Sequence, residues 1–342
     1  MSTSRSRGVS AIVVNYEGGS RLLDCLASLD QENVVQAIVV DNGSQDGSAA
    51  AATAAYPHIE LVAPARNLGF AGGANYGAQL ARAELLLFLN PDIRLGPGTV
   101  RELAGAFDGG RVAVAGPPLH VAVSGSVERG ATIDVIGSPV PVVREAQQAL
   151  YVPGCALMTR ADVFHDLGGF DERFFLFVED VDYCWRVLLR GYEVAVPAIE
   201  PVWHEGGAAA PGGYISGGRL ESTTFRVALR ERNTLAMLLK CYSAPLAAVI
   251  APLYALQSLA TAAALVATGR RATARAVVTG LGWNVRELRT TLRLRQRVQQ
   301  SRQVGDGPIV RRMYRGLWKL HLLRRFGIPT VVEGPAPVDA GR

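Results

Sequence analysis

Short apolar runs alternate with helical patterns through the first part of the chain, and this alternation constrains the fold more than any other feature. The apolar runs predict strands at 9–16, 36–44, 59–64 and 84–90, and the patterns between them predict helices at 20–29, 46–56 and 69–83. Continuous apolar strands separated by helices of about 10 residues are typical of βαβ units and a mostly parallel sheet. We therefore expect an α/β fold with helices flanking that sheet.

Polar residues follow three of these predicted strands. They are Asn15, the pair Asp41 and Asn42, and Asp92. Ligands of open α/β sheets bind at the carboxyl ends of the strands. Asp and Asn are also common turn residues, so any one of them alone would indicate only a turn. Together they predict a polar site at one edge of the sheet, and the absence of GxGxxG after the first strand argues against a dinucleotide cofactor.

Seven motifs follow one another in a recognisable order between residues 8 and 240. They are "AIVVNY", "VVDNGSQDGS", "ARNLGFAGGANYGAQLA", "LFLNPD", "GCALMTRADVFHDLGGFDERFFLFVEDVDYCWRVLLRGY", "VWHEGG" and "RERN". The ordered set resembles the inverting family-two glycosyltransferases, which have a GT-A fold, and most closely their bacterial rhamnosyltransferase-like branch. The resemblance implies transfer of rhamnose or another hexose from a dTDP-, UDP- or GDP-sugar. The acceptor would be a hydroxyl of a glycan or polyprenyl-linked acceptor in cell-surface polysaccharide synthesis.

A divalent cation is implied by this chemistry, because negative charge grows on the leaving diphosphate. The resemblance assigns Asp92 and His204 as ligands of Mg²⁺ or Mn²⁺, with phosphates and water completing the coordination. Asn90 occupies a position where the family often has Asp. We therefore expect Asn90 to be either a neutral helper beside Asp92 or a contact to the nucleotide, and we expect the loss of one charge to weaken metal binding.

The resemblance also assigns residues to the donor nucleotide. Asp41 is expected to accept a hydrogen bond from the base, while Asn15 and Tyr16 line the same pocket. Arg66 either faces the diphosphate or is a surface arginine at a helix start. The full set of predicted donor-binding residues is Asn15, Tyr16, Asp41, Asn42, Arg66, Asn67, Gly69 and Asn90.

Three acids occur together in "FFLFVEDVDYCWR", where a helix is expected to begin. Acids at a helix start are usually caps or partners of the helix dipole. The resemblance nevertheless implies that Asp180 is the catalytic base and that Glu179 supports it, while Asp182 serves the fold. An inverting transfer needs such a base to take the proton of the attacking hydroxyl.

Three further residues are assigned to the acceptor by the same resemblance. They are Gly154, Arg232 and Asn233. Gly154 would let an acceptor sugar lie against the backbone. For Arg232 and Asn233 the sequence offers no chemical reason beyond the matching motif.

The C-terminal part is basic and apolar. From Arg270 onward there are 16 Lys and Arg but four Asp and Glu, and 244–267 is apolar and without charge. The segment 244–267 is long enough to span a bilayer, but one span would place the basic tail outside, against the positive-inside rule. The pattern of 311–326 predicts an amphipathic helix on an anionic membrane, or else one docked on this domain or on a second subunit of a homo-oligomer.

These patterns predict a GT-A domain at 8–240, with a nucleotide-sugar half at 8–115 and an acceptor half at 116–240. A helical, membrane-associating region is expected at 241–330 and a flexible tail at 331–342. The start lacks a signal-peptide pattern, and the four cysteines lack CxxC spacing, so we expect a reducing compartment. The expected location is the cytoplasmic face of the inner membrane, as a peripheral or monotopic protein.

Other function classes fit less well. A sugar nucleotidyltransferase would need a glycine-rich basic loop after "AIVVNY", which the chain lacks. A nucleic-acid partner is not expected, because the basic tail lacks a recognisable reading module. The alternative kept open is a non-catalytic nucleotide-sugar binder or scaffold of a glycan assembly complex, favoured only by Asn90.

Overall fold

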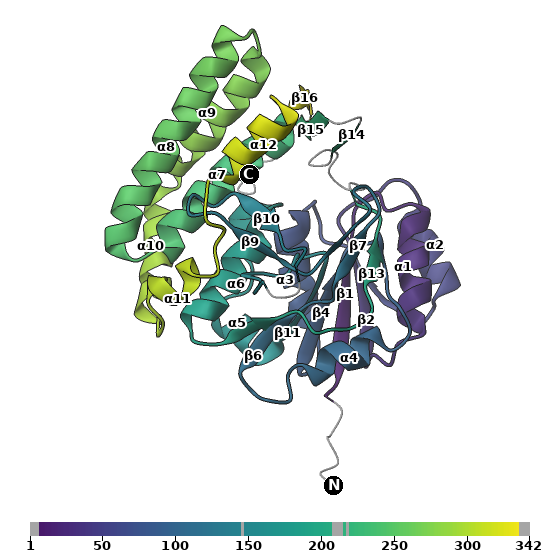
Figure 1. Ribbon diagram of the computed structural model, residues 1–342. Helices are drawn as coiled ribbons and strands as arrows, with labels where there is room; N and C mark the ends of the chain where they lie inside the picture. The colour runs from purple at the N-terminus through teal and green to yellow at the C-terminus, as the bar shows by residue number, and fades with distance from the viewer. Residues whose placement is uncertain (1–6, 145–146, 207–214, 217–218, 335–342) are drawn as a thin grey trace.

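The computed structural model describes residues 7–144, 147–206, 215–216 and 219–334 (Figure 1). Its centre is a seven-stranded sheet with the strand order β12-β6-β11-β4-β1-β2-β3. β11 is antiparallel to both of its neighbours, and the other strands are parallel. This confirms the expected α/β fold with a mostly parallel sheet. The strands are β1 (Val9–Asn15), β2 (Gln36–Asp41), β3 (Glu60–Val62), β4 (Leu85–Leu89), β6 (Val112–Ala115), β11 (Ala156–Arg160) and β12 (Glu193–Ala195).

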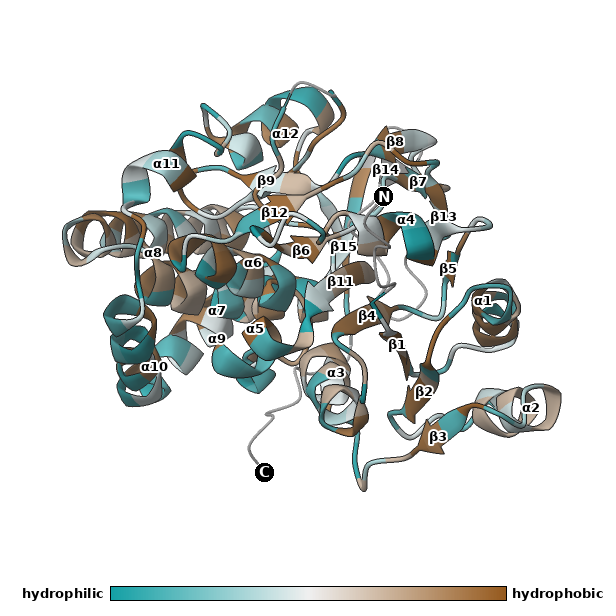
Figure 2. Ribbon diagram, turned by 90° about the horizontal axis from the view of Figure 1, so that it is seen from below, coloured by the Kyte–Doolittle hydropathy of each residue, from teal (hydrophilic) through white to brown (hydrophobic). Residues whose placement is uncertain are grey.

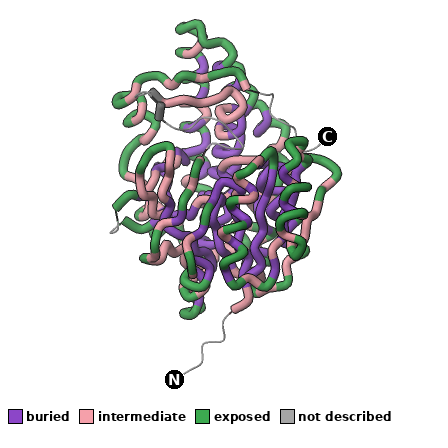
Figure 3. The backbone as a smooth tube through the Cα atoms, turned by 90° about the vertical axis from the view of Figure 1, so that its right-hand side faces the viewer, coloured by how far each residue is buried: buried purple, intermediate pink, exposed green. Residues whose placement is uncertain are grey.

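Helices cover both faces of this sheet, which explains why its central strands are apolar throughout (Figure 2). Side chains alternate along β1, so that Ile12 belongs to one buried cluster and Val13 to the other. The first face is covered by α3 (Gly69–Leu80), α5 (Ala161–Asp166) and α6 (Glu179–Leu189). The second is covered by α1 (Ser20–Asp30), α2 (Ser48–Ala55) and α4 (Thr99–Gly105). Figure 3 shows the buried backbone concentrated in the sheet between these layers.

A smaller four-stranded sheet lies beside the main one, with the order β5-β13-β7-β8. Its strands are β5 (Ile93–Arg94), β13 (Val202–His204), β7 (Leu119–Val121) and β8 (Ser126–Glu128). β13 pairs with β5 so that His204 is opposite Ile93. Because β5 begins directly after Asp92, this pairing brings two distant parts of the chain together at one point. A hairpin of β9 (Ala131–Ile133) and β10 (Pro139–Pro141) and the short helix η1 (Glu172–Phe174) complete this half.

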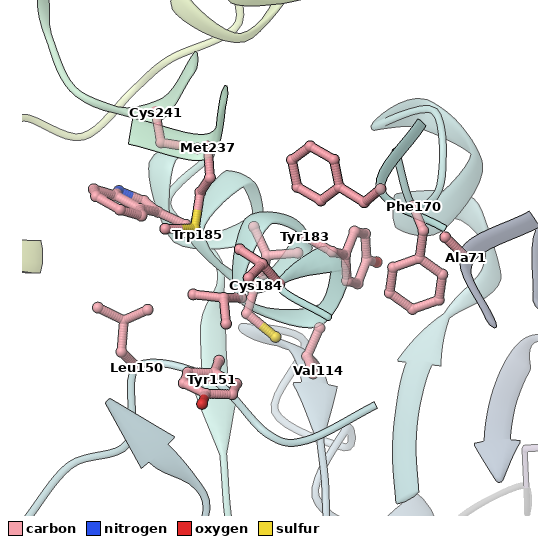
Figure 4. Close-up of a cluster of buried hydrophobic side chains, with 14 of the residues drawn as sticks. Ala71, Val114, Leu150, Tyr151, Phe170, Tyr183, Cys184, Trp185, Met237 and Cys241 are labelled. Atoms are coloured by element: carbon pink, nitrogen blue, oxygen red, sulfur yellow. The ribbon is translucent and has the colours of Figure 1, made fainter. Parts of the chain in front are cut away.

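A long helix, α7 (Thr224–Cys241), joins the sheet to the C-terminal helices. Figure 4 shows Met237 and Cys241 of α7 next to Trp185 of α6. Trp185 is fully buried, and its ring meets the ring of Tyr242 edge-on at 4.8 Å between centroids. The start of the C-terminal region is therefore part of the same core as the sheet.

The C-terminal helices pack against α7 as a layered bundle (Figure 1). They are α8 (Ala244–Ala267), α9 (Arg271–Arg286), α10 (Leu288–Gln300) and α11 (Asp306–Val310). α8 has the bounds expected from its composition, and it is long and apolar enough to cross a membrane. One side of α8 is buried, at Ile250 and Tyr254, whereas Leu253 and Leu256 are 52% and 64% exposed.

The amphipathic helix predicted at 311–326 is shorter in the structure, where α12 covers only Trp318–Phe326. Residues 311–317 instead run along β9, because Thr132 donates to the Arg312 carbonyl at 2.7 Å and the Tyr314 N–H donates to Ile133. Met313, expected on the apolar face of that helix, is buried and accepts a hydrogen bond from Tyr242 Oη. The prediction failed because helical spacing in the sequence does not reveal a neighbouring strand edge.

A small sheet of β14 (Ile215–Ser216), β15 (Arg219–Thr223) and β16 (Thr330–Val332) closes the structure near the start of α7. β15 and β16 are parallel, with Glu221 opposite Thr330. The expected flexible tail at 331–342 is thus corrected at its beginning, because Val331 and Val332 pair with β15. Residues 335–342 lie outside the part of the chain that the structure describes.

Candidate active site

Asn15 and Asp41 end adjacent parallel strands and lie opposite each other. The Asn15 amide Nδ2 donates to Asp41 Oδ1 at 2.9 Å, and it also reaches the hydroxyls of Ser44 and Ser48. Asn15 Oδ1 is buried and has no hydrogen-bond partner among the described residues. Tyr16, next in the chain, is 41% exposed. The structure therefore brings these three predicted nucleotide residues together at the sheet edge, and their contact with a base stays a prediction.

Asn42, Asn67 and Gly69 shape the start of α3. Asn42 donates to the Gly69 carbonyl at 2.9 Å and accepts from the Leu68 N–H, while Asn67 accepts from the Gly69 N–H at 2.8 Å. Gly69 has φ +69°, and a Cβ there would lie 2.2 Å from the Phe175 carbonyl oxygen. The glycine is thus required by close approach of the backbone at Phe175. Arg66 is exposed on the loop just before this turn.

Asp92 and His204 meet where β5 pairs with β13. The distance from His204 Nε2 to Asp92 Oδ2 is 3.6 Å. Asp92 is buried, and its Oδ1 has no hydrogen-bond partner in the described chain. The pair offers one imidazole and one carboxylate whose Oδ1 is buried without a hydrogen-bond partner among the described residues. These groups fit a divalent cation that takes its other ligands from phosphates and water. The described residues contain no group of three His, Cys, Asp or Glu that could hold a metal alone.

Two neighbours of this pair have other partners. The Asn90 backbone N–H donates to the Cys155 carbonyl at 2.9 Å, which fixes the end of β4 against the residue before β11. Glu205, next to His204 in the chain, is paired with Arg21 at 3.0 Å. Glu205 also donates its backbone N–H to the Asp92 carbonyl. These contacts hold Asp92 and His204 in place from both sides.

Glu179 and Asp180 begin α6, and they differ in their hydrogen bonds. Asp180 Oδ2 accepts from the Gly154 N–H at 2.9 Å, and its Oδ1 accepts from the Val181 N–H. Burial raises the pKa of Asp180, and these backbone hydrogen bonds act against the rise. Burial and the charge of Asp180 raise the pKa of Glu179 well above its usual range, and Glu179 Oε2 has no hydrogen-bond partner among the described residues. Burial therefore favours the protonated form of Glu179 more than that of Asp180, whose carboxylate accepts two backbone hydrogen bonds.

The segment Gly154–Cys155 lies between Asp180 and the pair of Asp92 and His204 in the hydrogen-bond network. Gly154 was expected to contact an acceptor sugar, and the structure shows its N–H bound to Asp180. Burial raises the pKa of the Cys155 thiol, and the charges of Asp92 and Asp180 raise it further. The Cys155 carbonyl also binds the N–H of Asn90, two residues before Asp92. Gly154 and Cys155, directly before β11, therefore link the segments that carry the two carboxylates. This places the candidate base and the candidate metal ligands at the same edge of the sheet.

The loop before Glu179 has an unusual backbone. Phe175, Phe177 and Val178 have φ values of 63°, 69° and 75°, in a region that bulky and β-branched residues rarely adopt. Such conformations persist only where surrounding contacts hold them, and they occur often at functional sites. The loop leads directly into the two acids, so its shape sets where their carboxyl groups lie.

Arg232 and Asn233 hold this loop. They are only 3% and 0% exposed, and both were predicted to bind the acceptor. We now assign them to positioning the acids, because their side chains are directed at loop carbonyls. Arg232 Nη2 donates to the carbonyls of Arg173 and Phe174, and Asn233 Nδ2 donates to those of Phe174, Leu176 and Phe177 at 2.8–3.0 Å.

A network of paired charges lies beneath the same loop. Lys240 Nζ is 2.5 Å from Asp171 and 2.8 Å from Asp182. Arg186 binds Asp182 at 2.9 Å and Arg173 binds Asp171 at 2.7 Å. Burial alone would raise the pKa of Asp171, but the charges of Lys240 and Arg173 hold it below its usual range. As expected, Asp182 serves the fold.

Sequence reasoning missed Arg226 and Arg230, which occupy the first turns of α7 on the side of Asp180. The Arg226 guanidinium lies 4.4 Å from the centre of the Phe177 ring. Burial raises the pKa of Asp180 and of Tyr151, and the positive charge of Arg230 acts against the rise in each. Two arginines four residues apart share one helix face. That spacing was visible in the sequence, but nothing local showed that the face lies beside the acids.

Comparison with known proteins places the chain among sugar-transferring enzymes. The model of glycosyl transferase family 2 matches residues 10–168. An N-acetylglucosaminyl-diphospho-decaprenol L-rhamnosyltransferase of Mycobacterium tuberculosis is 31% identical over 230 residues, covering 57% of this chain and 75% of that protein.

Two solved structures share the fold. A mannosyltransferase from Pyrobaculum calidifontis, in complex with GDP-Man and Mn²⁺, has a TM-score of 0.52 and 16% identity. That match covers 87% of this chain and 86% of the other. GalNAc-T7 with UDP, GalNAc and Mn²⁺ has a TM-score of 0.53 and 15% identity, over 67% of this chain and 48% of that one. At these identities the likeness shows the GT-A architecture alone.

Proposed function

This chain belongs to glycosyl transferase family 2, in its rhamnosyltransferase-like branch, and on that premise we propose its substrates and mechanism. The enzyme transfers a hexosyl group, with L-rhamnose as the first candidate, from a nucleoside diphosphate sugar. The acceptor is a hydroxyl of a glycan carried on a lipid diphosphate. The name of the mycobacterial relative supports both the sugar and the kind of acceptor.

The observation that carries the proposal is the link made by two adjacent residues: the Gly154 N–H binds Asp180, and the Cys155 carbonyl binds the N–H of Asn90, two residues before Asp92. Asn15 and Asp41 end their strands at the same edge. A direct displacement needs a donor diphosphate on one side of the reacting carbon and a base near the attacking hydroxyl on the other. Asp92 with His204 suits the first role, and Asp180 suits the second.

In the proposed mechanism, Asp180 accepts the proton of the acceptor hydroxyl as that oxygen attacks the anomeric carbon. The bond from that carbon to the diphosphate breaks, and the configuration inverts. The Gly154 N–H keeps the Asp180 carboxylate oriented. Glu179 stays protonated beside it, so that a second negative charge does not oppose the leaving diphosphate.

The Asp92 and His204 side chains are the proposed ligands for Mn²⁺ or Mg²⁺. When bound, the cation would neutralise charge on the departing diphosphate. Asp92 contributes one anionic oxygen and His204 a neutral nitrogen, which favours Mn²⁺ over Mg²⁺. Asn90 adds no charge, so the metal affinity of the free protein is expected to be low.

We also propose that the protein lies on the cytoplasmic face of a membrane. Leu253 and Leu256 of α8 and Leu320 and Leu323 of α12 are 40% to 64% exposed. Basic residues accompany them at the end of α12. This combination suits an anionic lipid surface. Flotation with anionic vesicles tests it, and equal recovery with neutral and anionic vesicles would count against it.

The test of the donor site is a thermal-shift panel with UDP, dTDP and GDP, each with and without Mn²⁺. Ligand at a hundred times its Kd stabilises the folded state by about 2.7 kcal/mol. We expect one nucleotide to raise Tm only with Mn²⁺, and this rise to disappear in Asp92→Asn. Asp108→Asn is the matched control, because Asp108 is exposed on the surface after α4. A Mn²⁺-independent shift would refute the metal assignment, and the nucleotide identified would direct the turnover assays.

A further inference from the structure

Arg226 and Arg230 form a concentrated positive charge near Asp180, the proposed catalytic base. They lie one turn apart near the start of α7, whose first turn is capped by Thr223. Arg226 covers the ring of Phe177, which is three residues before Asp180. Burial raises the pKa of Asp180 and of Tyr151, and the charge of Arg230 opposes both rises. The pair therefore borders the place where the acceptor hydroxyl must arrive.

These two arginines differ from the other arginines around the site. Arg173, Arg186 and Arg302 each pair with a carboxylate within 3.0 Å. In the part of the chain that the structure describes, no carboxylate lies within ion-pair distance of Arg226 or Arg230. Burial, and then the charge of Arg230, lower the pKa of Arg226 to about 9. Like charges at this helical spacing destabilise a helix, which opposes the favourable contact of Arg226 with the Phe177 ring.

A ligand with two negative charges would balance this site. Guanidinium groups bind phosphate oxygens through paired hydrogen bonds, and two of them match a diphosphate. In the proposed function the donor diphosphate already has a place at Asp92 and His204, whereas Asp180 is held by the Gly154 N–H. The arginine pair lies in the first turns of α7, directly after β15. The neighbouring Glu231 pairs with Lys319 of α12, the helix that carries the exposed Leu320 and Leu323. Its position suits a lipid-borne ligand.

We propose that Arg226 and Arg230 bind the diphosphate of the lipid-linked acceptor and so place the acceptor hydroxyl at Asp180. This inference rests on the proposed function and specifies which group of the acceptor is recognised. The enzyme would thus read two diphosphates, one through a cation at Asp92 and His204 and the other through arginines. Because the two sites use different chemistry, one can be removed without the other.

The test uses the full-length protein and farnesyl diphosphate, a short prenyl diphosphate without a sugar, with farnesol as the uncharged comparison. We expect the wild-type protein to bind farnesyl diphosphate and not farnesol. The double variant Arg226→Gln/Arg230→Gln should bind it at least about tenfold more weakly, as expected for losing hydrogen bonds to charged groups. In turnover assays the same variant should raise KM for the acceptor and leave KM for the donor unchanged.

The matched control is Arg275→Gln/Arg293→Gln, which removes the same charge from exposed positions of α9 and α10. It should bind farnesyl diphosphate like the wild-type protein. The Tm of Arg226→Gln/Arg230→Gln should stay equal or rise, since like-charge repulsion is removed. A lower Tm would mean that the pair serves the fold, and unchanged farnesyl diphosphate binding would refute the proposal.

The two proposals fail in different ways. If the arginine variant loses the Mn²⁺-dependent nucleotide shift instead, the pair belongs to the donor and the inference is overturned while the glycosyltransferase assignment stands. If wild-type protein binds farnesyl diphosphate through the arginines but transfers no sugar from any nucleotide donor, the proposed function is wrong and the anion site remains.

Discussion

Two groups of buried acidic residues lie close together in the chain, from just before η1 to the start of α6. The described basic residues pair with one group and not with the other. In the lower group, Asp171 and Asp182 are each held by two basic side chains. In the upper group, Glu179 and Asp180 make no ion pair with any described residue, and burial raises the pKa of both. The paired charges tie α6 to α7 and to Asp171, directly before η1. The unpaired ones are those to which the proposed mechanism gives proton transfer.

The largest effect should come from neutralising the upper group. Asp180→Asn removes the proposed base and is expected to lower kcat by about 10²- to 10⁴-fold. Its folding stability at neutral pH should be unchanged or higher. The reason is that a carboxyl whose folded pKa is raised destabilises the folded state once it ionises, and Asn cannot ionise. The measurements are steady-state turnover and urea unfolding of the same preparation. Full activity in Asp180→Asn would contradict the assignment of the base.

Breaking the lower group should affect stability instead. Lys240→Met leaves Asp171 and Asp182 buried with less positive charge, which is expected to cost about 3–5 kcal/mol of unfolding free energy. Lys319→Met is the control, because Lys319 also pairs with a glutamate but its side chain is 43% exposed. That control should cost about 1 kcal/mol or less. Equal losses in the two lysine variants would mean that the buried network has no special role.

The smallest effect on activity is expected from Glu179→Gln, which reproduces the protonated form of Glu179. At neutral pH its kcat/KM should change by about twofold or less. The raised pKa of Glu179 means that the folded state loses stability as pH rises through that pKa, and the Gln variant lacks this loss. Tm measured against pH should therefore show the variant gaining on the wild-type protein as pH increases. Glu102→Gln, an exposed change on α4, should show no such trend.

The parallel half of the fold could be predicted from sequence because its signals are local. Apolar runs and helical spacing gave the elements from β1 to β4 with bounds close to those observed. The polar residues after these strands also converge as predicted, since parallel strands end at one edge. The antiparallel direction of β11 and the pairing of β13 with β5 depend on contacts between distant segments, which periodicity does not encode.

The same limit applies to the site. The motif containing Arg232 and Asn233 was recognised, but its purpose was not, because the carbonyls that it holds belong to a loop far away in the sequence. Gly154 was likewise assigned to the acceptor, and its N–H binds the candidate base. The resemblance pointed to roles for Asp92 and Asp180, and the folded backbone added the contacts by which Gly154, Arg232 and Asn233 hold the neighbouring segments.

The pairing of β15 with β16 has a consequence for how the protein is made. β15 is synthesised well before β16, so Glu221 has no strand partner until Thr330 has been added. At the usual elongation rate of about 5–20 residues per second, this wait lasts about 5 to 20 seconds. During that interval the seven-stranded sheet is fully synthesised, while the strand leading into α7 exposes an unpaired edge, a known starting point for aggregation. A nascent chain therefore completes its main sheet before β15 can pair with β16. A ribosome that stalls late in translation would leave a finished sheet next to an open strand.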